Sequence, residues 1–155
     1  MDVCFVGHKT IEKTEELISS LKETVVTLIN KGANTFLFGR MSEFDELAWE
    51  TVTQIKKEYP LIKRVYVRAS YQHIDNSYEK HLLNFYEQTY FPPKIQNAGK
   101  YSYVERNYEM IDRADCCVFY YNKDYVLPPQ RRSSGTKIAY QYAKRKKKEI
   151  INLYK

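Results

Sequence analysis

The amino-terminal hydrophobic pattern predicts a buried strand, a tight turn and an amphipathic helix. The apolar run Val3–Val6 leads directly into the polar turn Gly7–Thr10. Beyond it, apolar residues recur at the spacing of one helix face, at Leu17, Ile18, Leu21, Val25, Leu28 and Ile29. Ligands of open parallel sheets bind beyond the carboxyl ends of the strands. The glycine at this turn therefore predicts a site where backbone amides approach an anionic group.

Apolar runs and amphipathic stretches continue to alternate along the chain. Further strands are predicted at residues 35–38, 62–67, 115–121 and 150–153. Further helices are predicted at residues 42–59, 77–88, 106–112 and 134–143, with regular structure resuming at residue 103 before the third of them. Because two helices separate the first three strands, these form a βαβαβ unit with parallel strands. The pattern predicts an α/β fold with a mostly parallel sheet of about five strands.

The length of 155 residues and the 43% hydrophobic content fit one domain spanning residues 1–155. Residues 71–100 interrupt the regular pattern and include Pro92-Pro93, so we predict a lid or an oligomer-contact insertion there. No apolar run approaches the roughly 20 residues that cross a bilayer, and the amino terminus lacks a signal-peptide pattern. We expect a cytoplasmic protein with no membrane partner.

The cysteine and histidine pattern predicts no metal site. Cys4, Cys116 and Cys117 lie within apolar runs, lack the spaced pairs of a zinc site and are expected to be buried thiols. His73 and His81 have no metal-like partners nearby in the sequence. The chain also lacks the G-x-x-x-x-G-K-S/T phosphate loop and a complete G-x-G-x-x-G signature. ATP hydrolysis and nicotinamide redox chemistry are therefore disfavoured, and no cofactor is predicted.

The positive charge is concentrated near the carboxyl terminus. The net charge is +6, but residues 122–155 alone contain ten Lys/Arg and two Asp/Glu. Five basic residues are adjacent at 144–148, on a helix that leads away from the predicted ligand edge. This run is interpreted as a solvated face or an oligomer contact, with phosphate binding as the alternative. The 15 tyrosines either stack on a base or fill core edges.

Polar or glycine residues follow the predicted strands. Because the carboxyl ends of parallel strands meet at one edge of a sheet, these residues are expected to converge. Ser134-Gly135-Thr136 offers backbone amides and two hydroxyls at the start of a helix, which suits a phosphate. The predicted ligand-binding residues are Gly7, His8, Lys9, Gly39, Arg40, Arg68, Arg106, Asn107, Ser134, Gly135 and Thr136.

Some of these residues have a structural interpretation that the sequence leaves open. His8 either hydrogen-bonds a ligand or closes the turn after the first strand. Asn107 lies where a helix is predicted to begin, so it either caps that helix or contacts the ligand. Ser42 and Asp45 have the spacing of a capping box, which predicts a helix start there.

Four segments resemble the SLOG superfamily, which includes the DNA-processing protein DprA, the LOG-type nucleotide phosphoribohydrolases and small standalone members. They are residues 5–9 (FVGHK), 38–45 (FGRMSEFD), 104–112 (VERNYEMID) and 134–137 (SGTK). The resemblance implies a Rossmann-like three-layer domain that binds a nucleotide or a nucleotide-derived ligand. It implies that Gly7, Gly135 and Thr136 hold phosphate or ribose, with Arg40 and Arg106 as charge partners.

The resemblance also bears on catalysis. The phosphoribohydrolases carry a P-G-G-x-G-T-x-x-E motif whose glutamate assists cleavage, whereas residues 132–139 read RSSGTKIA here and Ala139 takes the glutamate position. We therefore expect a binder that senses or sequesters an ADP-ribose-like or cyclic nucleotide signal, for which a phage-encoded anti-defence sponge is a concrete hypothesis. The resemblance further implies a homo-oligomer, either a dimer or a tetramer.

Two other functions remain as alternatives. One is hydrolysis of a nucleotide N-glycosidic bond, for which a carboxylate near the ribose is needed. Its candidate acids are Glu43, Asp45 and Glu105, of which Glu43 and Asp45 also suit a helix start. The other is DprA-like nucleic-acid binding, in which the basic run at 144–148 contacts phosphates.

Overall fold

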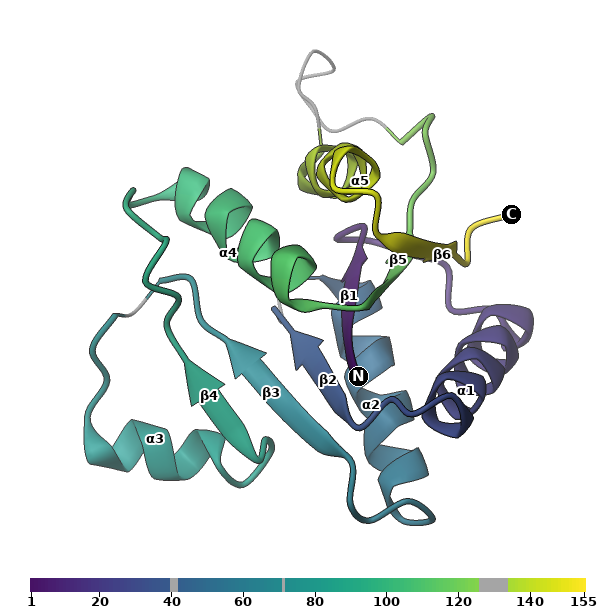
Figure 1. The fold of residues 1–155 in the computed structure, drawn as a ribbon, viewed down its shortest axis with the longest axis horizontal. Coiled ribbons are helices and arrows are strands. Elements are labelled where there is room, and N and C mark those ends of the chain that lie inside the picture. The colour runs from purple at the N-terminus through teal and green to yellow at the C-terminus, as the bar shows by residue number, and fades with distance from the viewer. Residues whose placement is uncertain (40–41, 71, 126–133) are drawn as a thin grey trace.

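The computed structural model describes residues 1–39, 42–70, 72–125 and 134–155. Strands and helices alternate along these residues (Figure 1). Their bounds are β1 (Asp2–Gly7), α1 (Glu15–Asn30), β2 (Thr35–Phe38), α2 (Glu43–Lys56), β3 (Lys63–Val67), α3 (Asn76–Leu82), β4 (Gln88–Tyr90), α4 (Lys100–Arg113), β5 (Cys116–Tyr120), α5 (Gly135–Arg145) and β6 (Glu149–Asn152).

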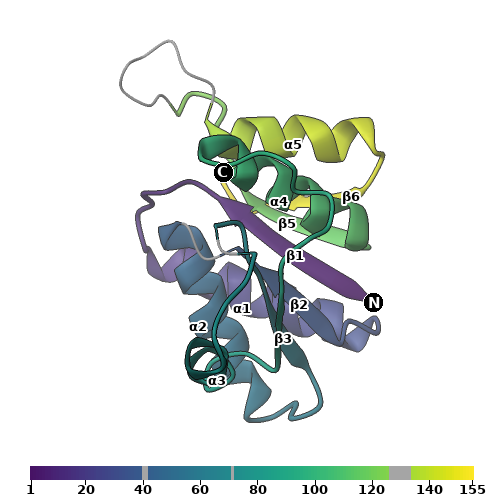
Figure 2. The same ribbon diagram turned by 90° about the vertical axis from the view of Figure 1, so that its left-hand side faces the viewer.

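The strands form one parallel sheet in the order β4-β3-β2-β1-β5-β6. Helices α1 and α2 cover one face and α4 and α5 the other, which gives the three layers of a Rossmann-like fold (Figure 2). From β1 the chain proceeds outward to β4, and it then continues on the opposite side with β5 and β6. The carboxyl ends of β1 and β5 therefore flank the topological switch point, where such sheets bind their ligands.

Both faces of the central strands are buried in apolar layers. On the α1/α2 face, the ring of Phe5 stacks on those of Phe36 and Phe38, with centroid distances of 6.0 and 5.2 Å. On the α4/α5 face, Cys4 and Cys117 are buried together with Met110 and Ala139. The three cysteines are free and buried, as predicted. Burial on both sides explains why these strands read as continuous apolar runs.

Hydroxyl and carboxylate side chains fix the starts of four helices. The caps are Thr14 for α1, Ser42 for α2, Asp75 for α3 and Ser134 for α5, and each accepts a hydrogen bond from the backbone N–H three residues later. The predicted cap at Ser42 is confirmed, at 3.0 Å from the Asp45 nitrogen. The caps Ser42 and Ser134 place the amino ends of α2 and α5 at the carboxyl edge of the sheet, where ligand binding is predicted.

The middle of the chain differs from the prediction. The sheet has six strands instead of about five, because residues 88–90 form β4 at the edge. The helix predicted at 77–88 is wrong beyond Leu82, where α3 ends. The next helix begins at Lys100 rather than at residues 106–107, so Asn107 lies in mid-helix and does not cap it. Gly99, with φ of 74°, starts α4 without a side-chain cap.

Within the described part of the chain, no helix is both long and apolar enough to cross a membrane.

Candidate functional site

A pocket of about 170 Å³ opens at the switch point. Its walls come from the end of β1, the starts of α2 and α5, the inner face of α4 and the segment after β5. The described lining residues are Val6, Gly7, His8, Lys9, Ser42, Asp45, Tyr103, Arg106, Asn107, Tyr125, Ser134, Gly135 and Thr136.

The start of α5 provides hydrogen-bond donors to this pocket. Gly135 and Thr136 are the first helical residues, so no earlier turn of α5 offers a carbonyl to their N–H groups. The Ser134 oxygen accepts from the Lys137 N–H at 3.0 Å, which leaves its hydroxyl proton as a donor. The helix dipole adds partial positive charge at the same end. This combination suits an anionic group such as a phosphate.

Arg106 brings a buried positive charge to the pocket from α4. Its side chain is 3% exposed, and Nη1 donates to the Gly39 carbonyl oxygen at 2.7 Å. Burial lowers the pKa of this guanidinium, while the charge of Asp45 acts in the opposite direction. A Cβ atom on Gly39 would lie 2.6 Å from Arg106 Cζ, so the glycine makes room for the guanidinium. Gly39 thus supports Arg106 and is not itself among the described lining residues.

His8 is neutral and 1% exposed in the turn after β1. Its Nε2 accepts a hydrogen bond from the Asn122 N–H at 2.8 Å, so the ring proton is assigned to Nδ1. Among the described residues, no group accepts that proton, although the atom is buried. The ring stacks on Tyr125, with centroids 3.9 Å apart. His8 therefore joins the turn after β1 to the segment after β5, and it also lines the pocket.

The environment of His8 predicts a pH dependence of stability. Burial lowers its pKa from 6.5 to about 4. As the pH falls below 6.5, the unfolded chain binds a proton that the folded chain does not. We expect the free energy of unfolding to decrease by about 1–3 kcal/mol between pH 6.5 and 4 for this reason. Urea unfolding of wild type and His8→Gln across this range measures it; parallel profiles for the two proteins would contradict the assignment.

The three candidate carboxylates have different surroundings. Asp45 is 7% exposed and lines the pocket. Glu43 instead accepts from the Ile11 N–H at 3.1 Å and holds the turn after β1. Glu105 accepts from the Asn97 side chain at 2.9 Å, and mainly this bond lowers the pKa of its carboxyl group. Of the three candidate acids, Asp45 is therefore the one among the described residues that line the pocket.

Eight of the predicted ligand-binding residues meet in this pocket, although no bound ligand tests their roles. They are Gly7, His8, Lys9, Arg106, Asn107, Ser134, Gly135 and Thr136. Arg68 follows β3 and is not among the described residues that line the pocket. Arg40 lies outside the described residues. Tyr103 and Tyr125 also line the pocket but were not predicted, because only the folded chain brings them to it. The high number of tyrosines was the only feature of the sequence that pointed to them.

Gly7 also allows a close contact between β1 and α2. A Cβ atom at this position would lie 2.4 Å from the ring of Phe44 and 2.5 Å from Phe44 Cβ. The space next to Gly7 is thus filled by the first turn of α2. The Lys9 carbonyl also accepts from the Glu43 N–H at 2.9 Å, which fixes this contact between β1 and α2.

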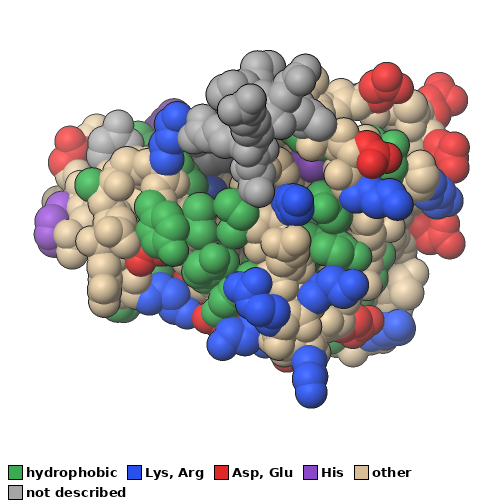
Figure 3. Space-filling view, turned by 90° about the horizontal axis from the view of Figure 1, so that it is seen from above, with side chains coloured by type: hydrophobic (Ala, Val, Ile, Leu, Met, Phe, Trp, Pro, Cys, Tyr) green, Lys and Arg blue, Asp and Glu red, His purple; other side chains and the backbone are tan. Residues whose placement is uncertain are grey.

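The basic run lies at the opposite end of α5 from the pocket. Lys144–Lys147 are exposed around the carboxyl end of the helix. Lys144 packs over the ring of Tyr140, and Arg145 and Lys146 pack over that of Tyr142. Figure 3 shows basic side chains beside hydrophobic ones on this face. Lys148 instead donates to the carbonyls of Asp112 and Ala114, which is a structural contact.

Metal-ligating residues do not gather at this site. Within the described ranges, no group of three or more His, Cys, Asp and Glu side chains is placed to hold a metal ion. The pocket's chemistry therefore comes from a helix start, two basic side chains, a neutral imidazole and one carboxylate.

Comparisons with known proteins agree with the resemblance seen in the sequence. The chain is similar to a solved structure of DNA processing protein A from Helicobacter pylori, which was described for its single-stranded DNA binding mode. The identity is 16% and the TM-score 0.60, over 97% of this chain and 63% of that one, so the likeness concerns the fold. No curated protein matches. The YpsA model, described as the YspA SLOG family, matches residues 3–154. The chain therefore belongs to this SLOG family.

Proposed function

We propose that this protein binds a nucleotide-derived small molecule, such as an ADP-ribose-like or cyclic nucleotide signal, and senses or sequesters it unchanged. One observation carries the proposal: the start of α5, Lys9 and the buried Arg106 converge in one pocket at the switch point of a parallel sheet. In this arrangement the ligand phosphate accepts from the N–H groups of Gly135 and Thr136. Arg106 contributes positive charge beside the ribose, and His8 lines the same pocket.

The absence of catalysis is part of the proposal. Ala139, at the position of the glutamate in the phosphoribohydrolase motif, is 1% exposed and packs in the core between α5 and the sheet. The carboxylates of Glu43 and Glu105 hold backbone N–H groups of neighbouring loops. Asp45 alone among the candidate acids lines the pocket, and a lone carboxylate lacks the second acid–base group that glycosidic cleavage usually employs.

The fate of the ligand tests this function. Purified protein is incubated with AMP, ADP-ribose, NAD or a cyclic ADP-ribose isomer, separated from free ligand and heat-denatured, and the released molecule is analysed by chromatography. We expect at least one of these compounds to be recovered intact from the protein. Appearance of free base or ribose phosphate in the incubation would instead show hydrolysis, and Asp45→Asn would then be the first variant to assay.

Single-stranded DNA is an alternative ligand, because the similar DNA processing protein A binds it. The basic run of this chain gives it no support at the pocket, since Lys144–Lys147 lie around the other end of α5. An oligonucleotide that displaced AMP, with an affinity falling steeply as salt increases, would favour this alternative.

A further inference from the structure

A second hollow of about 420 Å³ adjoins the pocket at the start of α5 and differs from it in chemistry. It lies between the ends of β3 and β4 and the start of α4, and Tyr103 lines both pockets. Among its described lining residues none is charged. The walls instead offer the amides of Gln72, Gln96 and Asn97 and the aromatic side chains of Phe91 and Tyr103. We call this hollow the amide pocket.

The first pocket is smaller than most small-molecule sites. Its volume of about 170 Å³ is below the range of about 300–1,000 Å³ that is usual for small-molecule sites. On the proposed function, the space between α5 and Arg106 is assigned to a phosphate and its ribose. The base of the same molecule then needs a separate, uncharged pocket. Tyr103 lies between the two pockets and lines both of them.

Contacts within the fold hold the walls of the amide pocket in place. Glu105 accepts from the backbone N–H groups of Gln96 and Asn97, at 3.2 and 3.0 Å, and fastens this loop to α4. The hydroxyls of Tyr103 and Ser70 are 2.7 Å apart, which joins α4 to the end of β3. The Tyr103 ring also lies 5.7 Å from Arg106 Cζ, so one residue orients groups in both pockets.

On the basis of the proposed function, we propose that the amide pocket binds the nucleobase of the ligand whose phosphate lies at α5. A base is flat and uncharged, and it presents donors and acceptors on its edge that side-chain amides match. Its faces stack on aromatic rings such as those of Phe91 and Tyr103. The ligand class is thus a nucleotide with its base bound between the β4–α4 loop and α4.

Paired binding measurements with AMP and ribose 5-phosphate, followed by NMR titration, test the proposal. Because stacking contributes about 1–3 kcal/mol per base, wild type should bind AMP about tenfold or more tightly than ribose 5-phosphate. Ala98→Trp places a large side chain at an exposed residue of the amide pocket. It should remove this preference while leaving the affinity for ribose 5-phosphate unchanged.

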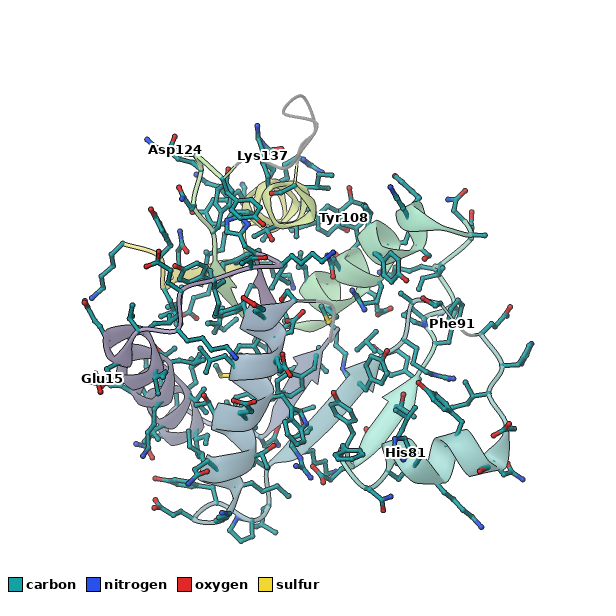
Figure 4. All side chains as sticks on the ribbon, turned by 180° about the vertical axis from the view of Figure 1, so that it is seen from behind. Glu15, His81, Phe91, Tyr108, Asp124 and Lys137 are labelled. Carbon is teal, nitrogen blue, oxygen red and sulfur yellow. The ribbon has the colours of Figure 1, made fainter. Side chains whose placement is uncertain are left out.

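Asn84→Trp is the matched control, since Asn84 is exposed and precedes β4, whereas Phe91 follows it. Figure 4 shows Phe91 and His81 at opposite ends of this strand. Glu105→Gln is a second variant, which weakens the hydrogen bonds that hold residues 96–97 against α4. Like Ala98→Trp, it should reduce the preference for AMP over ribose 5-phosphate. The Asn84→Trp control should bind both compounds as wild type does.

The outcomes separate the two proposals. Equal affinities of wild type for AMP and ribose 5-phosphate would overturn the base site and leave the phosphate site standing. An undiminished AMP preference in Ala98→Trp would also overturn the base site. If neither compound binds to wild type, the phosphate site at α5 fails and the base site fails with it.

Discussion

Replacing Gly7 by alanine is expected to lower the free energy of unfolding by about 3 kcal/mol. The new Cβ would lie within 2.5 Å of three atoms of the Phe44 side chain, including its Cβ. A rotation of the ring cannot relieve contact with Phe44 Cβ, so the first turn of α2 must move away from β1. Phe44 is fully buried, and its displacement also disturbs the core beneath the pocket.

Denaturant unfolding of Gly7→Ala and Gly135→Ala provides a matched comparison. A Cβ atom on Gly135 would meet nothing within 4 Å, and this residue is helical. Gly135→Ala should therefore change the free energy of unfolding by less than about 1 kcal/mol. Similar values for the two variants would contradict the close packing of α2 against β1 described above.

Arg106→Met is expected to weaken AMP binding at least tenfold and to destabilise the fold by about 1–3 kcal/mol. The substitution removes the hydrogen bond of 2.7 Å from Arg106 Nη1 to the buried Gly39 carbonyl oxygen. The positive charge that interacts with the carboxylate of Asp45 is lost as well. It also removes the only buried cation among the described residues that line the pocket. Calorimetric titration and denaturant unfolding measure the two effects.

Arg113→Met on the same helix is the control. Arg113 forms a partly exposed ion pair with Asp2, at 2.9 Å, far along α4 from Arg106. Such pairs contribute about 0–1 kcal/mol, so this variant should remain close to wild type in stability and should bind AMP normally. Equal losses of AMP binding in both variants would argue against a specific role of Arg106.

The α/β architecture was predictable because local signals coincide with tertiary structure. Strands β1, β2 and β5 are buried on both faces, and so they read as apolar runs. Ser42 and Ser134 mark helix starts with side-chain caps that the sequence displays. Strand β4 carries no such signal: its three residues, Gln-Thr-Tyr, are ordered by their register with Val65–Val67 at the edge of the sheet.

The missed features of the site depend on tertiary contacts. Helix α4 starts at Gly99 without a side-chain cap, so its true beginning, and the mid-helix position of Asn107, could not be read from capping residues. Tyr125 reaches the pocket by stacking on His8, more than 100 residues away in the chain. The sequence predicted that the residues after β1 meet the start of α5, but not which side chains fill the space between them.

Titration of AMP into wild type, Gly135→Asp and Gly135→Asn by calorimetry tests the central claim most directly. An aspartate in the first turn of α5 is favourable for the helix dipole, and the side chain has open space, so both variants should fold. The carboxylate should repel a phosphate there and reduce AMP affinity at least tenfold, whereas the isosteric asparagine should not. Equal AMP affinities for the aspartate and asparagine variants would show that no phosphate binds at the start of α5.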